Sequence, residues 1–115
     1  MLFVCYPKCT TCQKAKKWLE DHNVEYELRN IKEENPNAEE LKEWYKKSGL
    51  DIKKFFNTSG LLYKSMNLKE KLPEMSEDEK LELLASDGML VKRPLLITDD
   101  KVLVGFREAA YEEIV

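Results

Sequence analysis

Long apolar runs are absent from this sequence of 115 residues. No uninterrupted apolar stretch approaches the roughly 18 residues that a membrane-spanning helix needs. The apolar run at the N-terminus ends at Pro7 and Lys8, and it is shorter than the roughly 7 to 15 residues of a signal-peptide core. We therefore expect a cytoplasmic protein that does not bind membranes.

An excess of positive charge is also absent. Lysine and arginine together number 19 against 22 for aspartate and glutamate, which gives a formal net charge of -3. This balance provides no long-range attraction toward phosphate backbones. We therefore predict no direct binding of nucleic acid.

Histidine is scarce, and this scarcity limits the metal sites that the chain can build. The single histidine, His22, is predicted at the far end of a helix from three clustered cysteines. A closed zinc site usually needs four ligands, so we predict no metal site. We interpret His22 as a cap on the C-terminus of its helix rather than as a catalytic base.

The composition indicates one globular domain over residues 1–115. Hydrophobic residues make up 43% of the sequence and charged residues 36%, which is typical of a folded chain with a solvated surface. No linker rich in glycine, proline or serine divides the sequence, and it contains no internal repeat.

Hydrophobic periodicity predicts a strand, a helix and a second strand in the N-terminal part. Residues 2–6 form a short apolar run typical of a buried strand, and residues 10–22 show the spacing of an amphipathic helix. Val24, Tyr26 and Leu28 alternate with charged residues, which predicts a half-buried strand. A parallel crossover between the two strands is the favoured geometry.

The middle of the chain, approximately residues 35–88, is predicted to be helical. Helix starts are indicated at residues 35–37 and at Ser76, where Glu79 completes a capping box. Residues 61–75 fit no single pattern.

The C-terminal part predicts a hairpin and a last helix. Residues 95–97 and 102–104 are short aliphatic runs separated by four turn-prone residues. Residues 107–114 follow as a helix. The predicted order is therefore β-α-β, a helical middle, then β-β-α, which is an α/β architecture.

All three cysteines lie in one stretch, CYPKCTTC, which runs from Cys5 to Cys12. In a reducing compartment such a cluster is usually catalytic, redox-active or metal-binding. Three interpretations remain open. The C-x3-C-x2-C spacing suits an iron–sulfur cluster, the C-x-x-C of Cys9 and Cys12 suits a redox dithiol, and both could be ordinary structural cysteines.

The predicted local structure favours the dithiol. Cys5 falls inside the first strand, so we expect a buried core residue. Cys9 falls at the N-terminus of the helix, where unpaired backbone N–H groups stabilise a thiolate and Lys8 adds positive charge. Cys12 is one turn further on, within reach of a disulfide with Cys9. We predict that Cys9 is the nucleophile and Cys12 the more buried resolving thiol.

Four segments carry a resemblance to a known family. In order they are CYPKCTTCQKAKKWL, NTSGLLYK, LVKRPLLI and VGF. Together they make essentially the whole chain similar to the arsenate reductase family of the thioredoxin superfamily, which also contains the Spx redox regulators. The resemblance implies a thioredoxin (glutaredoxin)-like fold, with a four-stranded mixed sheet, an inserted helical subdomain and a cis bond before Pro94.

The resemblance also implies roles for particular residues. In the family's arsenate reductases a cysteine in the place of Cys9 attacks arsenate, arginines hold the oxyanion, and glutathione with glutaredoxin releases arsenite. Arg93 matches one such arginine, and Arg107 lies at or next to another. Asn57 stands where these enzymes carry a third arginine, and Cys12 stands where they carry serine or another residue.

We therefore hypothesise a thiol-dependent oxidoreductase in which Lys8, Asn57, Arg93 and Arg107 surround a small oxyanion substrate. No bound cofactor is implied; glutathione or another thiol is the co-substrate, and glutaredoxin or thioredoxin the partner. The alternative is a redox switch similar to the Spx regulators, whose C-x-x-C controls binding to the C-terminal domain of the RNA polymerase α-subunit.

Overall fold

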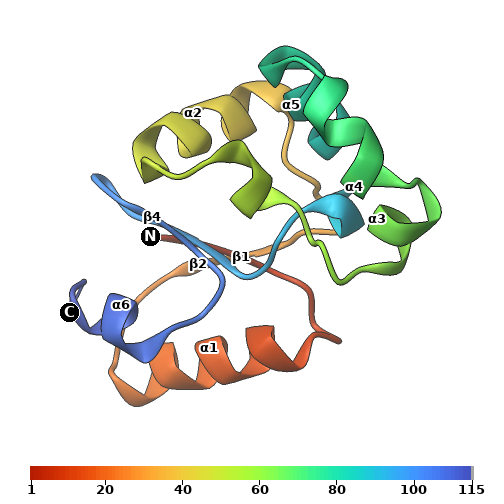
Figure 1. Ribbon diagram of the computed structural model, residues 1–115. Coiled ribbons are helices and arrows are strands. Elements are labelled where there is room, and N and C mark those ends of the chain that lie inside the picture. Colours follow the sequence, from red (N-terminus) through yellow and green to blue (C-terminus); the bar gives the residue numbers. More distant parts are fainter. Residues whose placement is uncertain (115) are drawn as a thin grey trace.

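A four-stranded mixed sheet lies at the centre of the computed structural model, which describes residues 1–114 (Figure 1). β1 (Leu2–Cys5) runs parallel to β2 (Glu27–Asn30), whereas β3 (Leu95–Ile97) is antiparallel to both β1 and β4 (Val102–Val104). The predicted parallel crossover and C-terminal hairpin are therefore confirmed. In spatial order the strands are β2, β1, β3 and β4.

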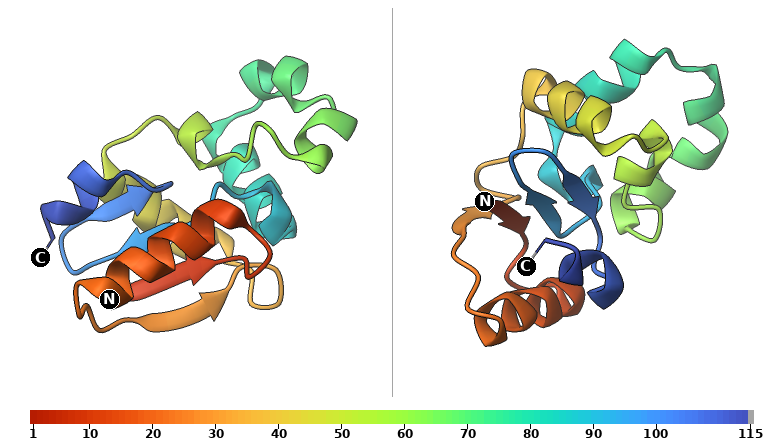
Figure 2. Two further views of the ribbon diagram at one scale, coloured as in Figure 1. Left: turned by 90° about the horizontal axis from the view of Figure 1, so that it is seen from below. Right: turned by 90° about the vertical axis from the view of Figure 1, so that its left-hand side faces the viewer.

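Helices lie on both sides of this sheet (Figures 1 and 2). On one side are α1 (Thr10–Asp21) and α6 (Glu108–Glu112). On the other side is the segment between β2 and β3, in which α2 (Ala38–Ser48) packs against β4 and α5 (Glu77–Ser86). This is a thioredoxin (glutaredoxin)-like fold with an inserted helical segment, as predicted. The insertion contains α2, the 3₁₀ helix η1 (Ile52–Phe55), α3 (Leu61–Ser65), α4 (Leu68–Lys71), η2 (Leu72–Glu74), α5 and η3 (Gly88–Leu90).

The alternation of side chains along β1 divides the buried residues into two cores, because successive residues of a strand face opposite sides of the sheet. Phe3 and Cys5 face α1, whereas Val4 faces the insertion. The α1-side core comprises Phe3, Cys5, Cys12, Ala15, Trp18, Leu19, Leu96 and Tyr111.

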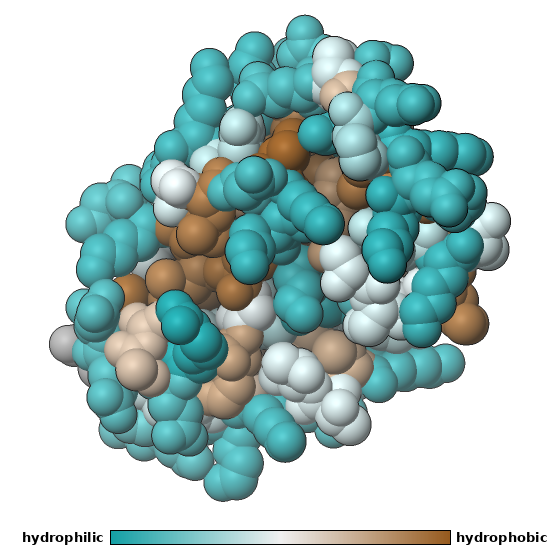
Figure 3. All heavy atoms as spheres, viewed as in Figure 1, coloured by the Kyte–Doolittle hydropathy of each residue, from teal (hydrophilic) through white to brown (hydrophobic). Residues whose placement is uncertain are grey.

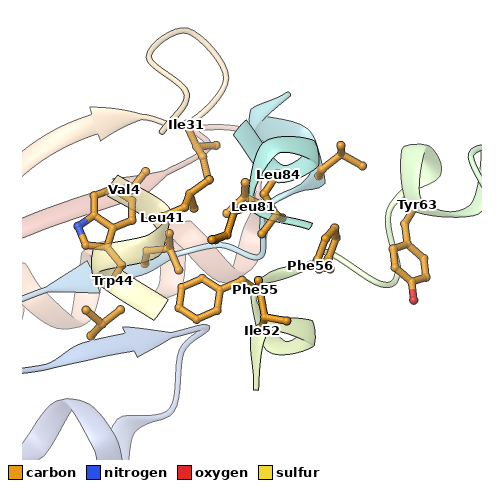
Figure 4. Close-up of a cluster of buried hydrophobic side chains, with 14 of the residues drawn as sticks. Val4, Ile31, Leu41, Trp44, Ile52, Phe55, Phe56, Tyr63, Leu81 and Leu84 are labelled. Carbon is orange, nitrogen blue, oxygen red and sulfur yellow. The ribbon is translucent and has the colours of Figure 1, made fainter. Parts of the chain in front are cut away.

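The insertion-side core is the larger of the two. Figure 4 shows side chains from β1, α2, η1 and α5 meeting there, among them Val4, Leu41, Phe55 and Leu84. Its members are aliphatic or aromatic, so hydrophobic burial is the main interaction that holds the insertion on the sheet. They are Val4, Ile31, Leu41, Trp44, Ile52, Phe55, Phe56, Tyr63, Leu68, Leu72, Leu81, Leu84, Leu90, Val91, Leu95 and Val102.

Capping boxes fix the starts of the two longest helices of the insertion. The Asn37 side chain accepts a hydrogen bond from the Glu40 backbone N–H at 2.8 Å, and the Glu40 carboxylate accepts one from the Asn37 N–H at 3.1 Å. Ser76 and Glu79 make the same reciprocal pair at the start of α5. The capping box predicted at Ser76 is therefore confirmed.

One part of the chain differs from the prediction, and a second completes a segment that fits no single sequence pattern. Val24 and Tyr26 precede β2 instead of belonging to it, and Leu28 within β2 is 53% exposed. β2 is an edge strand with a neighbour on one side only, so alternation there overstates burial. Residues 61–75 form α3, α4 and η2, each too short to produce a readable periodicity.

The surface is mostly hydrophilic on the face of Figure 1. Figure 3 shows teal side chains over most of this face, with brown apolar atoms gathered in its middle, between the helical insertion and the lower half. Within residues 1–114, every helix is too short or too polar to span a membrane.

Candidate active site

A cavity of about 600 Å³ lies where the N-terminal end of α1 meets two segments of the insertion. It brings together three of the side chains predicted from the sequence, namely Cys9, Asn57 and Arg93. They come from parts of the chain about fifty and eighty-five residues apart, and only folding brings them to one place. The lining residues are Cys9, Thr11, Asn57, Ser59, Gly60, Leu61, Leu62, Met89, Lys92 and Arg93.

Cys9 is the N-cap residue of α1 and is half-buried at the edge of this cavity. Its backbone is fixed by two hydrogen bonds. Its N–H donates to the Tyr6 carbonyl oxygen at 3.0 Å, and its carbonyl oxygen accepts from the Gln13 N–H at 3.1 Å. The Cys9 side chain makes no capping hydrogen bond, so the sulfur remains available for attack on a ligand in the cavity.

Arg93 approaches the cavity from the segment that precedes β3. Its Nη1 donates to the carbonyl oxygens of Met89 at 3.3 Å and Val91 at 3.5 Å, and its guanidinium carbon lies 5.4 Å from the centre of the Tyr6 ring. These contacts use one nitrogen and one face of the guanidinium. The other N–H groups have no protein partner among residues 1–114, so they can donate to an anion. The Arg93–Pro94 peptide bond is cis, the isomer that the resemblance implied.

Asn57 is held at the cavity by the turn that follows it. Its N–H donates to the Leu90 carbonyl oxygen at 2.8 Å, and its own carbonyl oxygen accepts from the Gly60 N–H at 3.0 Å. A Cβ on residue 60 would lie only 2.6 Å from the Asn57 Nδ2, so glycine permits this close packing. Ser59 Oγ donates to Asn57 Oδ1 at 3.4 Å, which orients the amide.

Two residues predicted at the site do not line this cavity. Lys8 is exposed in the loop before α1. Arg107 lines a separate cavity of about 160 Å³ together with Tyr111, because the chain turns at Gly105, where φ is +79°, and Arg107 then begins α6. Lys92 supplies a cation that the sequence analysis missed, although its place beside Arg93 was a signal.

Cys12 lies behind Cys9 and is 2% exposed. Its sulfur accepts a hydrogen bond from the Tyr6 N–H at 3.3 Å. It packs with Cys5 in the α1-side core, and Cys9 packs against this core from the edge of the cavity. All three cysteines are free thiols, so the structure describes the reduced protein.

The bond between Cys5 and Cys12 sets their order of ionisation. Donation by the Cys12 thiol lowers the pKa of Cys5, and the charge of Lys16 acts in the same direction against the effect of burial. The same bond, followed by burial, raises the pKa of Cys12 well above its usual range. Cys5 is buried as predicted, and it is also the first thiol of this pair to ionise.

His22 lies far from the cysteine cluster along α1 and caps the helix. Its Nδ1 donates to the Trp18 carbonyl oxygen at 2.8 Å, and its ring stacks on Trp18 with centroids 3.8 Å apart. The interpretation of His22 as a cap is confirmed. Across residues 1–114, no three side chains of His, Cys, Asp or Glu are grouped to hold a metal ion.

The sheet order, the dithiol at the start of α1 and the loop ending at Pro94 define the class, a thioredoxin-like thiol protein with a helical insertion. Residues 5–114 match the model of the ArsC family, and the chain belongs to this family.

Two relatives come from Bacillus subtilis (strain 168). The uncharacterized protein YusI is 63% identical over 113 residues, which cover 98% of this chain and 96% of YusI. The regulatory protein MgsR is 35% identical over 106 residues, which cover 92% of this chain and 82% of MgsR. The family therefore includes a regulator among the relatives of this chain.

Two solved structures are similar over nearly the whole chain. An ArsC family related protein from Bacteroides fragilis has a TM-score of 0.97 and 55% identity, covering 99% of this chain and 96% of its own. A possible arsenate reductase from Streptococcus mutans UA159 has a TM-score of 0.90 and 48% identity, covering 98% and 95%. Both likenesses extend through the helical insertion that completes the cavity.

Proposed function

We propose that this protein is a thiol-dependent oxidoreductase of the arsenate reductase type, with Cys9 as the nucleophile. The observation that carries the proposal is the shared cavity, in which Cys9 lies with the cations Arg93 and Lys92. A thiolate and two cations suit a tetrahedral oxyanion, because the cations neutralise its charge while the sulfur attacks its centre. Arsenate is the substrate that the family membership favours.

The first step forms a covalent adduct. The Cys9 thiolate attacks the As(V) centre of arsenate, a sulfur–arsenic bond forms, and one oxygen leaves as water after protonation. Arg93 and Lys92 bind the remaining oxygens. Asn57, which stands where the resemblance places a third arginine, contributes an amide in place of a charge, so Lys92 takes over part of that role.

The second step reduces arsenic. Cys12 attacks the Cys9 sulfur while its proton passes to an oxygen of the arsenic group. The sulfur–arsenic bond breaks, and its electron pair stays on arsenic, which leaves as arsenite. Two thiols lose two electrons to form the Cys9–Cys12 disulfide, and As(V) gains two to become As(III). The position of Cys12 supports this role, because it is buried one helical turn from Cys9, which packs against the same core. Glutathione, glutaredoxin or thioredoxin then reduces the disulfide.

Arsenite formation tests this proposal directly. Purified protein is incubated with arsenate and either glutathione with glutaredoxin or a thioredoxin system, and arsenite is measured by chromatography with elemental detection. We expect turnover in the wild type and none in Cys9→Ser. Activity that survives in Cys9→Ser would refute the mechanism, and absence of activity in the wild type with both reductants would refute the substrate.

A matched pair of lysine variants tests the cavity. Lys92→Ala removes a cation that lines it, and Lys8→Ala removes an exposed cation outside it. We expect KM for arsenate to rise about tenfold in Lys92→Ala, since a charge-assisted hydrogen bond contributes about 1.5 kcal/mol, and to change little in Lys8→Ala. Equal effects in the two variants would contradict the placement of the substrate.

The relationship to MgsR supports a second candidate, a redox switch that binds the RNA polymerase α-subunit in one thiol state. The Cys9–Cys12 pair would then change the surface around α1 instead of turning over a substrate. Pull-down with the C-terminal domain of the α-subunit under reducing and oxidising conditions tests it. Absent binding, or binding that is equal in both states, would eliminate the switch.

A further inference from the structure

The third cysteine is placed to take part in thiol chemistry. β1 directs the Cys5 side chain toward α1, and the first turn of α1 directs Cys12 back toward the sheet, so that the two thiols pack in the same core and line one cavity. Cys9, one helical turn before Cys12, packs against the same core. A disulfide that forms at Cys12 therefore has two partners within reach.

Cys5 and Cys12 also line a cavity of their own. It has a volume of about 230 Å³ and lies between the loop after β1, the first turns of α1 and Leu28 of the edge strand. Lys16 lines it as an exposed cation. Cys9 lines the larger cavity and is not among the residues of this second one. Cys12 thus lines the second cavity, whereas its predicted partner Cys9 lines the larger one.

We propose that Cys5 is a third redox thiol in a disulfide relay. By attacking Cys12, it replaces the Cys9–Cys12 disulfide at the substrate cavity by a Cys5–Cys12 disulfide at the second cavity. This inference rests on the proposed function for the first disulfide. The Cys5 thiolate attacks the Cys12 sulfur of the Cys9–Cys12 disulfide, a Cys5–Cys12 bond forms, and Cys9 leaves as a thiolate. One disulfide replaces another, so no electrons are gained or lost.

The charges around the three sulfurs favour this direction. Lys16 stabilises negative charge on Cys5. This effect remains in the Cys9–Cys12 disulfide, in which Cys12 no longer has a thiol hydrogen to donate. The leaving sulfur, Cys9, is half-buried at the N-terminus of α1, where backbone N–H groups face a departing thiolate. The exchange therefore replaces a buried thiolate by one at a more accessible position and returns Cys9 to its reactive form.

Because the two cavities are separate, the relay would separate substrate chemistry from reduction of the disulfide. Product can leave the larger cavity while the Cys5–Cys12 disulfide is held at the second cavity. A thiol reductant can reach this disulfide through the second cavity, where Lys16 attracts an anionic thiol. The reductant class is a small anionic thiol or an exposed protein thiol.

Trypsin separates the candidate disulfides, because it cuts after Lys8, between Cys5 and Cys9. Wild-type protein is oxidised with one equivalent of diamide, quenched in acid, alkylated with N-ethylmaleimide, digested and analysed by mass spectrometry. We expect peptide 1–8 to be linked to peptide 9–14, with the label on Cys9. A label on Cys5, with the disulfide inside peptide 9–14, would overturn the relay and leave the proposed function intact. A label on Cys12 would overturn both.

Two variants separate failure of the relay from failure of the proposed function. In Cys5→Ser we expect the Cys9–Cys12 disulfide to accumulate; if it does not form there, the proposed function and the relay both fall. In Cys9→Ser we expect Cys5–Cys12 to form at least about tenfold more slowly, since the accessible thiol is lost. Formation at the wild-type rate would overturn the exchange step. The wild-type peptide map decides the question even if a variant fails to fold.

Discussion

The two sides of the sheet bury different chemistry. The insertion-side core is aliphatic and aromatic, whereas the α1-side core contains two thiols and the hydroxyl of Tyr111, which has no hydrogen-bond partner among residues 1–114. The side chains of Val4 and Cys5, which are neighbours on β1, point to opposite sides of the sheet. We infer that the insertion mainly supplies stability and holds the cavity walls, while the α1 side carries the reactive sulfur at some cost in polar burial.

The largest expected effect is at Gly88, where the end of the insertion meets the sheet. A Cβ there would overlap the carbonyl oxygen and carbon of Ile31, which are backbone atoms that cannot move independently. We expect Gly88→Ala to lower the free energy of unfolding by about 3 kcal/mol or more, measured by urea denaturation. Gly49→Ala is the matched control, because, apart from its immediate chain neighbours, no atom of residues 1–114 lies within 4 Å of an added Cβ there. The φ of +69° alone costs about 1 kcal/mol for alanine. Equal losses would contradict the tight junction.

A smaller effect is expected where β2 is tied to α2. Arg29 Nη1 donates to Glu40 Oε2 at 2.6 Å and Nη2 donates to Oε1 at 2.9 Å, and these bonds hold the pKa of Glu40 below its usual range. A carboxyl with a lowered folded pKa stabilises the fold above its unfolded pKa, and this contribution is lost as pH falls through the folded value. Glu40→Gln keeps the capping box and removes the charge, so we expect a loss of about 2 kcal/mol at neutral pH.

The pH dependence distinguishes this ion pair from the cap alone. We expect the difference in unfolding free energy between the wild type and Glu40→Gln to shrink as pH falls below about 4. Glu79→Gln, which changes the other capping box where the pKa of the carboxyl is lowered by Ser76 and not by an arginine, is the control. A pH-independent difference for Glu40→Gln would mean that the arginine contributes little.

The sequence was informative wherever a local pattern was strong. The Ser76 capping box, the helix that starts after Cys9 and the aliphatic hairpin near the C-terminus all follow from adjacent residues, and the structure contains them. The residues of the cavity were predictable only in part. Cys9, Asn57 and Arg93 carried the family resemblance, but Lys92 and Gly60 contribute through packing between distant segments, which periodicity does not encode.

The thiol cluster shows the same limit. Strand alternation places Cys5 on one side of the sheet, and helix spacing places Cys12 on one face of α1. Their packing against each other depends on how α1 docks on β1, which neither pattern specifies. Arg107 lies outside the larger cavity for a related reason, because its place depends on the turn at Gly105.

A test of the α1 side alone is the removal of the unpaired hydroxyl. Tyr111 is fully buried, and burial raises the pKa of its hydroxyl well above the usual range. We expect Tyr111→Phe to raise the free energy of unfolding by about 1 kcal/mol, seen as a higher Tm, because a buried hydroxyl without a partner is costly. Tyr63→Phe is the control on the insertion side, where Figure 4 shows the oxygen pointing away from the cluster. A lower Tm for Tyr111→Phe would show that its hydroxyl is satisfied in solution.

Gly60→Ala has the smallest expected effect on stability and tests whether the insertion also contributes to substrate binding. Gly60→Ala places a methyl group 2.6 Å from the Asn57 Nδ2, the end of a side chain that can rotate away, so we expect less than about 1 kcal/mol of destabilisation. The displaced amide leaves the oxyanion with one donor fewer, and KM for arsenate should rise by about three- to tenfold. Asn57→Ala without the glycine change should reproduce that rise, because both variants remove the same donor. If KM is unchanged in both variants, the insertion shapes the cavity but Asn57 does not bind the substrate. The insertion would then contribute to stability alone, and the chemistry would depend on the α1 side of the sheet and the segment before β3.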